Sequence, residues 1–132
     1  MAYTTIDNPA EHFQPVIWTG NGSDDRAINI DMQPDFVWWK HRTNASYWHY
    51  LVDSNRGIGK QIYTNGNDAE DTHSGGHVKS YTSTGITIDD DQAINYNTAT
   101  YAGYMWKANG GTTSTLTAGT INSTVQTNST AD

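Results

Sequence analysis

Two short stretches of the sequence gather side chains of the types that bind metal ions. The stretch Asp68–His77 holds two histidines, His73 and His77, and three carboxylates, and zinc and related divalent ions accept both ligand types. Gly75 and Gly76 lie between the histidines and prevent the regular helical geometry that would align the two rings. A flexible, solvated loop therefore explains this stretch better, and we expect no metal ion there.

A run of three aspartates, Asp89, Asp90 and Asp91, offers the oxygen ligands that calcium prefers. The run lacks the interleaved glycine and the distal glutamate of a calcium-binding loop. A solvated turn is the simpler interpretation, so the sequence predicts neither a metal site nor any other cofactor.

The sequence offers no convincing set of catalytic residues. None of its serines stands in a Gly-x-Ser-x-Gly motif. The segment Gly57–Gln61 lacks both the upstream glycine and the Ser or Thr that a phosphate-binding loop carries after its lysine. Glycoside hydrolysis needs two carboxylates across one cleft, but the only glutamates are Glu11 and Glu70, and Asp53 ends an expected strand, where Asp commonly caps a turn. We therefore predict that the chain is not an enzyme.

Aromatic side chains are the best candidates for ligand binding. Flat apolar rings beside Asn, Asp and His side chains suit one face of a pyranose, and Trp and Tyr combine contact area with a polar group. The alternative is that every second ring fills the core, with Trp38 beside Phe36 and Trp106 beside Tyr104.

Both interpretations hold if some rings face inward and their neighbours face solvent. Adjacent positions of a strand point to opposite faces, so we expect Trp39 and Trp48 to be the exposed rings. The predicted glycan-binding residues are Trp39, Trp48, Tyr50 and His49.

Short runs of β-branched and aromatic residues, bounded by Gly and Asn, predict about nine strands and no long helix. The clearest runs are 13–19, 27–30, 36–42, 47–53, 60–63, 78–82, 86–88 and 99–107. One helical turn is expected near 9–13 or 67–71. Pro15 lacks an N–H donor, which predicts that the first strand lies at a sheet edge. The expected fold class is all-β, an antiparallel two-sheet sandwich or jelly roll.

The composition bounds the organisation and the partners. The 132 residues carry a net charge of −7, and no run of Lys or Arg could displace counterions from phosphates, so neither nucleic acid nor an anionic membrane is an expected partner. The sequence has no cysteine and no apolar span, and its first residues lack the basic and apolar regions of a signal peptide, so we expect folding in a cytoplasm. We expect an N-terminal arm over residues 1–12, a sandwich domain over 13–111, and a polar, Thr-rich linker or assembly strand over 112–132.

Four blocks of sequence occur in an order that is typical of a known type of domain. They are Phe13–Gly22, Gln33–Arg42, Leu51–Gly57 and Tyr101–Gly111. Together they resemble a domain found, often in tandem, in tail-fibre and other virion proteins of marine bacteriophages, although Trp18, Met32 and Tyr104-Met105 depart from its pattern. The resemblance implies a concanavalin-like jelly roll with a structural or adhesive role, commonly in a trimer, and it supplies no catalytic residues.

The residues and the resemblance together predict a structural or adhesive virion protein, from a tail or capsid fibre, that acts in assembly and host-surface attachment. Its expected partners are other virion proteins, further copies of itself and a host surface glycan. A free carbohydrate-binding module is the first alternative, and a polysaccharide depolymerase is the second. Light scattering combined with a glycan array would separate them.

Overall fold

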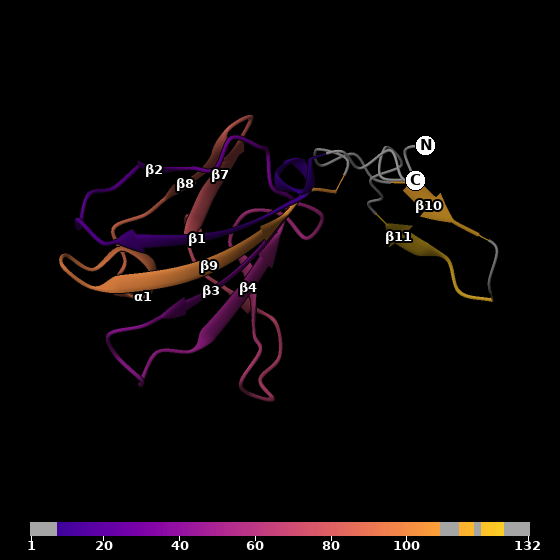
Figure 1. The fold of residues 1–132 in the computed structure, drawn as a ribbon. Helices are drawn as coiled ribbons and strands as arrows, with labels where there is room; N and C mark the ends of the chain where they lie inside the picture. Colours follow the sequence, from indigo (N-terminus) through magenta and orange to yellow (C-terminus); the bar gives the residue numbers. More distant parts are fainter. Residues whose placement is uncertain (1–7, 109–113, 118–119, 126–132) are drawn as a thin grey trace.

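Two antiparallel sheets face each other across the core of the protein (Figure 1). The computed structural model describes residues 8–108, 114–117 and 120–125. In spatial order, the six-stranded sheet consists of β1 (Phe13–Thr19), β9 (Thr100–Trp106), β3 (Phe36–His41), β4 (His49–Asp53), β5 (Lys60–Tyr63) and β6 (Asp71–Thr72). The three-stranded sheet consists of β2 (Arg26–Asn29), β8 (Gly85–Ile88) and β7 (Val78–Thr82). The prediction of an all-β, two-sheet antiparallel sandwich is confirmed.

The strand at the edge of the larger sheet is β1, as Pro15 predicted. β1 pairs with β9, with Pro15 opposite Tyr104, and it has no partner on its other side among the described residues. A residue without an N–H is tolerated there because its missing donor leaves no gap inside a ladder.

Two single turns of helix flank the strands. η1 (Pro9–Glu11) is the helical turn expected near residues 9–13. It begins after Asn8, whose side chain accepts a hydrogen bond from Ala10 N. α1 (Gln92–Asn95) was not expected; Asp91 caps it by accepting a hydrogen bond of 2.7 Å from Ala93 N. Neither is long enough to cross a membrane, and no other described helix is either.

The inner face of the larger sheet carries every second side chain of β3, β4 and β9, including Val37, Trp39, Tyr50, Tyr101 and Met105. These side chains pack against isoleucines of the smaller sheet and of α1, which are also buried. The indole N–H groups of two core tryptophans donate to backbone carbonyls of α1, at 2.9 Å for Trp18 and 3.1 Å for Trp39. The short helix therefore satisfies the polar groups of the largest core residues.

The prediction of which aromatic side chains face the core is wrong for β3 and β9. Trp38 and Phe36, and likewise Trp106 and Tyr104, were expected in the core, but they lie on the outer face of the larger sheet, while Trp39 is buried. A one-residue change of phase moves a whole set of side chains to the other face. Because aromatic residues occupy consecutive positions in β3, the sequence is compatible with either alternate set of side chains facing the core.

The Thr-rich C-terminal segment forms a small sheet of its own where the structure describes it. β10 (Ser114–Leu116) pairs with β11 (Ser123–Val125) in an antiparallel hairpin. Residues 112–113, 118–119 and 126–132 of the expected linker, and residues 1–7 of the expected arm, lie outside the described residues.

Candidate functional site

The structure separates the four predicted glycan-binding residues. Trp39 is 0% exposed and Tyr50 is 5% exposed, and the two rings stack at 4.9 Å inside the core. The expectation that Trp39 is an exposed ring is therefore wrong, because β3 directs it, as β4 directs Tyr50, toward the smaller sheet. Trp48 is 41% exposed and stacks on Tyr63, whereas His49 lies half-buried on the outer face of the larger sheet.

The exposed rings gather instead on the outer face of the larger sheet. We call this cluster the outer aromatic face, and it consists of Phe13, Phe36, Trp38, Tyr104 and Trp106. The strand register creates it: Phe13 of β1, Trp106 of β9 and Phe36 of β3 are aligned across three neighbouring strands. Two residues along, Tyr104 is aligned with Trp38 in the same way.

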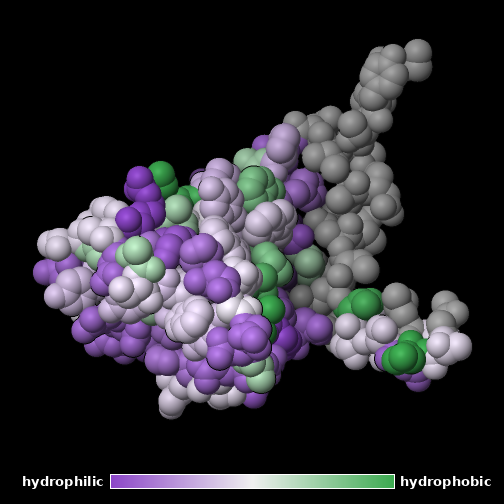
Figure 2. Space-filling view, turned by 90° about the horizontal axis from the view of Figure 1, so that it is seen from below, coloured by the Kyte–Doolittle hydropathy of each residue, from purple (hydrophilic) through white to green (hydrophobic). Residues whose placement is uncertain are grey.

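The rings of the outer aromatic face support one another. Phe13 and Trp106 lie 4.8 Å apart, Phe36 meets Trp106 edge-on at 5.0 Å, and Trp38 lies 5.5 Å from Tyr104. Phe13, Tyr104 and Trp106 are 37%, 39% and 39% exposed. Most of the surface visible in Figure 2 is hydrophilic or near neutral. A contiguous group of exposed rings on such a surface marks a candidate interaction site.

Polar groups border the outer aromatic face. His49 lies edge-on to Trp38 at 5.6 Å, and the Trp38 indole N–H donates to the Thr64 hydroxyl at 2.8 Å. Asp53 of β4 is aligned with Phe36 and forms an ion pair of 2.7 Å with Arg56. The arrangement combines flat apolar contact area with hydrogen-bonding groups at its edge.

Apart from the outer aromatic face, a hollow of about 360 Å³ lies among the loops at one end of the sandwich. Its lining includes His41, Tyr47, Gln92, Tyr96 and Thr98. His41 stacks on Tyr47 at 4.7 Å, and burial lowers its pKa below the usual range, with a smaller contribution from the Lys40 charge. Thr98 has a φ of 70°, a left-handed conformation that costs energy for a β-branched residue.

The structure brings together the two stretches that were considered as metal sites. Gly75 and Gly76, with φ values of 81° and 79°, reverse the chain so that the rings of His73 and His77 stack at 3.9 Å. No helix forms here, as the two glycines predicted, but their left-handed turn aligns the rings without one.

The aspartate run supplies carboxylates to the same cluster. Asp89 Oδ2 lies 3.1 Å from His73 Nε2, and Asp91 Oδ1 lies 3.3 Å from His77 Nε2. The contact with His77 lowers the pKa of Asp91 to about 2, whereas burial raises the pKa of Asp89. We call His73, His77, Asp89 and Asp91 the His–Asp cluster.

Sequence reasoning missed the outer aromatic face and the His–Asp cluster for different reasons. The pairs Phe36/Trp38 and Tyr104/Trp106 share a spacing of two residues, which predicts a common face but not which face. The His–Asp cluster joins residues that are 14 and 16 positions apart, and only the packing of the loop after β6 against the end of β8 brings them together.

Comparison with known proteins gives a family but no relative of known function. The model of a domain of unknown function, DUF7483, matches residues 8–132. No curated protein and no solved structure matches the chain.

Proposed function

We propose that this chain, which belongs to the DUF7483 family, is a non-catalytic adhesive module of a bacteriophage virion that binds glycan on its outer aromatic face. The virion context comes from the four sequence blocks that resemble tail-fibre domains, from Phe13–Gly22 to Tyr101–Gly111. In this proposal the module assembles with further copies, as a trimer, and with other virion proteins on a tail or capsid fibre.

One observation carries the binding part of the proposal: rings from three neighbouring strands form a cluster on a sheet face that could have been polar. The side chains of Phe13, Tyr104 and Trp106 are each more than a third exposed to solvent. Exposed apolar rings in a protein with a net charge of −7 are typical of an interaction surface. A sheet holds rings at a fixed spacing, so little conformational entropy is lost when a ligand is bound.

A glycan fits this surface better than an apolar partner does. The hydrophobic faces of pyranose rings can pack on Trp106 and Tyr104, while the hydroxyl groups at the ring edge reach polar side chains such as His49. Phe13, Tyr104 and Trp106 are each more than a third exposed in the described part of the chain, and such a row of accessible rings suits a long, extended chain of sugars.

The carboxylates that a depolymerase would use are engaged with a common cation. Arg56 forms ion pairs with Asp53 at 2.7 Å and with Glu70 at 3.3 Å. A carboxylate whose oxygens are engaged by a guanidinium is not free to meet the glycosidic oxygen of a substrate. This arrangement supports binding without hydrolysis.

The proposal is tested with a glycan array followed by calorimetric titration of the strongest ligand. Trp106→Ala and Tyr104→Ala should each weaken binding at least about tenfold, a loss of roughly 1.4 kcal/mol. Tyr96→Ala serves as the matched control, because Tyr96 is an exposed ring at the loop hollow rather than on the outer aromatic face. Thermal melts of all variants establish that they remain folded.

The outcomes are distinct. Loss of binding in the Tyr96 variant alone would move the glycan site to the loop hollow. If Trp106→Ala instead dissociates an oligomer in light scattering and no glycan binds to the wild type, the outer aromatic face is an interface between copies, and the adhesive proposal is wrong. Release of reducing ends from a bound polysaccharide would make the protein an enzyme.

A further inference from the structure

We infer that the His–Asp cluster is a binding site for a divalent transition-metal ion of the zinc class, with His73, His77 and Asp91 as ligands and Asp89 beside them. The inference does not depend on glycan binding, because the cluster lies between the loop after β6 and the β8–α1 connection rather than on the outer aromatic face.

The spacing of the candidate ligand atoms suits such an ion. One atom each from His73, His77 and Asp91 lie within 4.8 Å of one another. Zinc binds imidazole nitrogen and carboxylate oxygen at about 2.0–2.2 Å, which corresponds to a tetrahedral edge of roughly 3.3–3.6 Å. The distance from His77 Nε2 to Asp91 Oδ1, 3.3 Å, lies within this range. The His73 ring stacks on His77 at 3.9 Å, so His73 must rotate out of this stack to direct a nitrogen at the same ion.

A buried glutamine fixes which nitrogen of His77 faces the cluster. Gln61, which is 2% exposed, directs its amide Nε2 to Asp71 Oδ2 at 3.0 Å. A carboxylate accepts hydrogen bonds, so the NH₂ group must point to Asp71 and the amide oxygen must point to His77. That oxygen lies 2.8 Å from His77 Nδ1, and Nδ1 therefore carries a proton and donates it to Gln61.

The consequence is that the lone pair of neutral His77 lies on Nε2 and points at Asp91. These two atoms, 3.3 Å apart, stay together only with a proton on Nε2 or a cation between them. A metal ion bound there takes the place of that proton, and the His77–Gln61 hydrogen bond is the outer-shell contact that metal-ligating histidines usually make through their second nitrogen. Imidazole ligands favour zinc, cobalt or nickel over calcium, which prefers oxygen.

The backbone holds the cluster in place. His73 N donates to Gly59 O at 2.9 Å, and Asp89 N donates to His77 O at 3.1 Å. Gly76 has a φ of 79°, and a Cβ there would lie 2.7 Å from Val78 O, so the turn requires glycine. The ligands are thus presented by hydrogen-bonded backbone on both sides of the site.

The test is a calorimetric titration of the untagged full chain with zinc sulfate after dialysis against EDTA. We expect one zinc ion per chain and, with cobalt, the intense visible absorption of a tetrahedral complex. His73→Ala removes a half-exposed ligand, and Asp91→Asn removes an anionic ligand while Asn still caps α1. Each should weaken zinc binding at least about tenfold.

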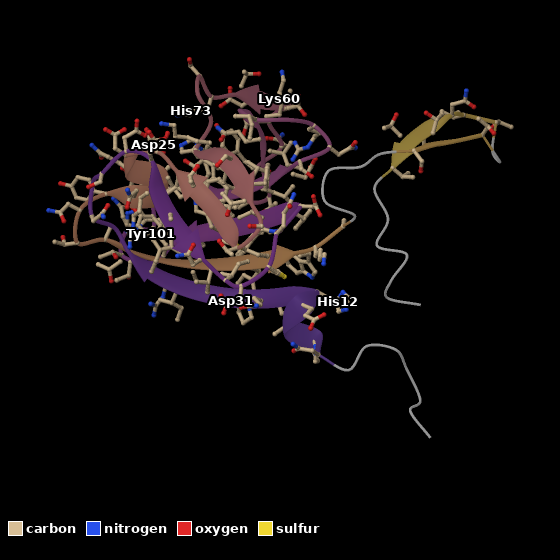
Figure 3. All side chains as sticks on the ribbon, turned by 90° about the horizontal axis from the view of Figure 1, so that it is seen from above. His12, Asp25, Asp31, Lys60, His73 and Tyr101 are labelled. Carbon is tan, nitrogen blue, oxygen red and sulfur yellow. The ribbon has the colours of Figure 1, made fainter. Side chains whose placement is uncertain are left out.

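His12→Ala is the matched control, because Figure 3 places His12 on the opposite side of the domain from His73; it should bind zinc as the wild type does. Absence of zinc binding by the folded wild type would overturn the inference and leave the His–Asp cluster as a hydrogen-bonded network alone. Equal zinc affinity in the wild type and in folded His73→Ala and Asp91→Asn variants would also overturn it. Calcium in millimolar excess should not displace zinc, and displacement would contradict the ligand assignment.

Discussion

The carboxylate of Asp35 accepts a hydrogen bond of 2.8 Å from the hydroxyl of Ser54. Its other oxygen accepts one of 2.6 Å from the amide of Ala108, and Asp35 itself is 0% exposed. These residues belong to three of the sequence blocks that resemble the phage domain, Gln33–Arg42, Leu51–Gly57 and Tyr101–Gly111. At this position the blocks form a buried polar junction that ties the start of β3 to the end of β4 and to the exit of β9.

The first prediction concerns this junction. Asp35→Ala should destabilise the fold strongly, because it empties a fully buried position and deprives the partly buried Ser54 hydroxyl and Ala108 amide of their acceptor, at up to about 1–3 kcal/mol for each group. Urea denaturation followed by tryptophan fluorescence measures the loss. Asp90→Ala, at an exposed position, is the control and should change stability by less than about 0.5 kcal/mol. Similar denaturation midpoints for the two variants would contradict the role of Asp35.

A second prediction separates the two tryptophans that the sequence could not distinguish. Trp39→Ala should cost about 3–5 kcal/mol, because it removes a fully buried ring and leaves a cavity. Trp48→Ala should cost much less, since Trp48 is 41% exposed and its main ring contact is the stacking on Tyr63. Thermal melts of both variants provide the measurement, and a larger loss for Trp48 would mean that the strand phase described here is wrong.

The strands of this fold could be predicted because they are short, bounded by turn residues and rich in β-branched and aromatic side chains. The expected run 13–19 coincides with β1, and 60–63 and 78–82 coincide with β5 and β7. The phase of β3 could not be predicted, because Trp38 and Trp39 fit either face equally well by residue type. The short α1 was missed because a single turn of four residues is too short to show helical periodicity.

The candidate sites were harder to predict than the strands. Both halves of the His–Asp cluster were recognised as stretches of metal-ligand types, but each half alone was better explained as a solvated loop. Their meeting depends on two left-handed glycines and on the packing of α1, which are tertiary properties. Of the predicted glycan-binding residues, His49 borders the outer aromatic face and Trp48 is exposed elsewhere.

A third prediction concerns acid. His41 Nδ1 accepts backbone N–H bonds from Thr43 and Asn44 at 3.2 and 3.0 Å, and burial lowers the pKa of His41 below its ordinary value of 6.5. Below about pH 6.5 the unfolded chain takes up a proton that the folded ring resists. The stability from this group is therefore complete above that pH and is lost as the pH falls toward the lower pKa of the folded state.

The measurement is the melting temperature between about pH 7.5 and 5. His41→Gln should flatten this dependence, because a glutamine oxygen can accept the same N–H bonds without titrating. His49→Gln is the comparison: the pKa of His49 is lowered by the same two causes, but His49 is less buried than His41, so its replacement should flatten the pH dependence less. An unchanged pH dependence in His41→Gln would exclude His41 as its source.

A fourth prediction concerns the C-terminal segment. Deletion of residues 112–132 should leave the sandwich folded, because β10 and β11 pair with each other and add no strand to either large sheet. The melting temperature of the shortened chain, compared with the full chain at equal concentration, tests this directly. A collapse of the melting temperature would show that the segment belongs to the core, whereas loss of oligomers with an intact fold would identify it as an assembly element.

The last prediction links the buried core to the His–Asp cluster. Gln61→Met keeps the approximate volume of the side chain but removes the acceptor of the His77 Nδ1 proton. His77 would then be free to change tautomer and orientation, so zinc affinity should fall roughly 10–100-fold although no ligand has been changed. Lys60→Met, at the neighbouring position of β5, is the control, because Lys60 contacts Thr72 and Glu70 but no member of the cluster. Equal zinc affinities in the two variants, both shown to be folded by circular dichroism, would mean that Gln61 supports the core alone and does not orient a metal ligand.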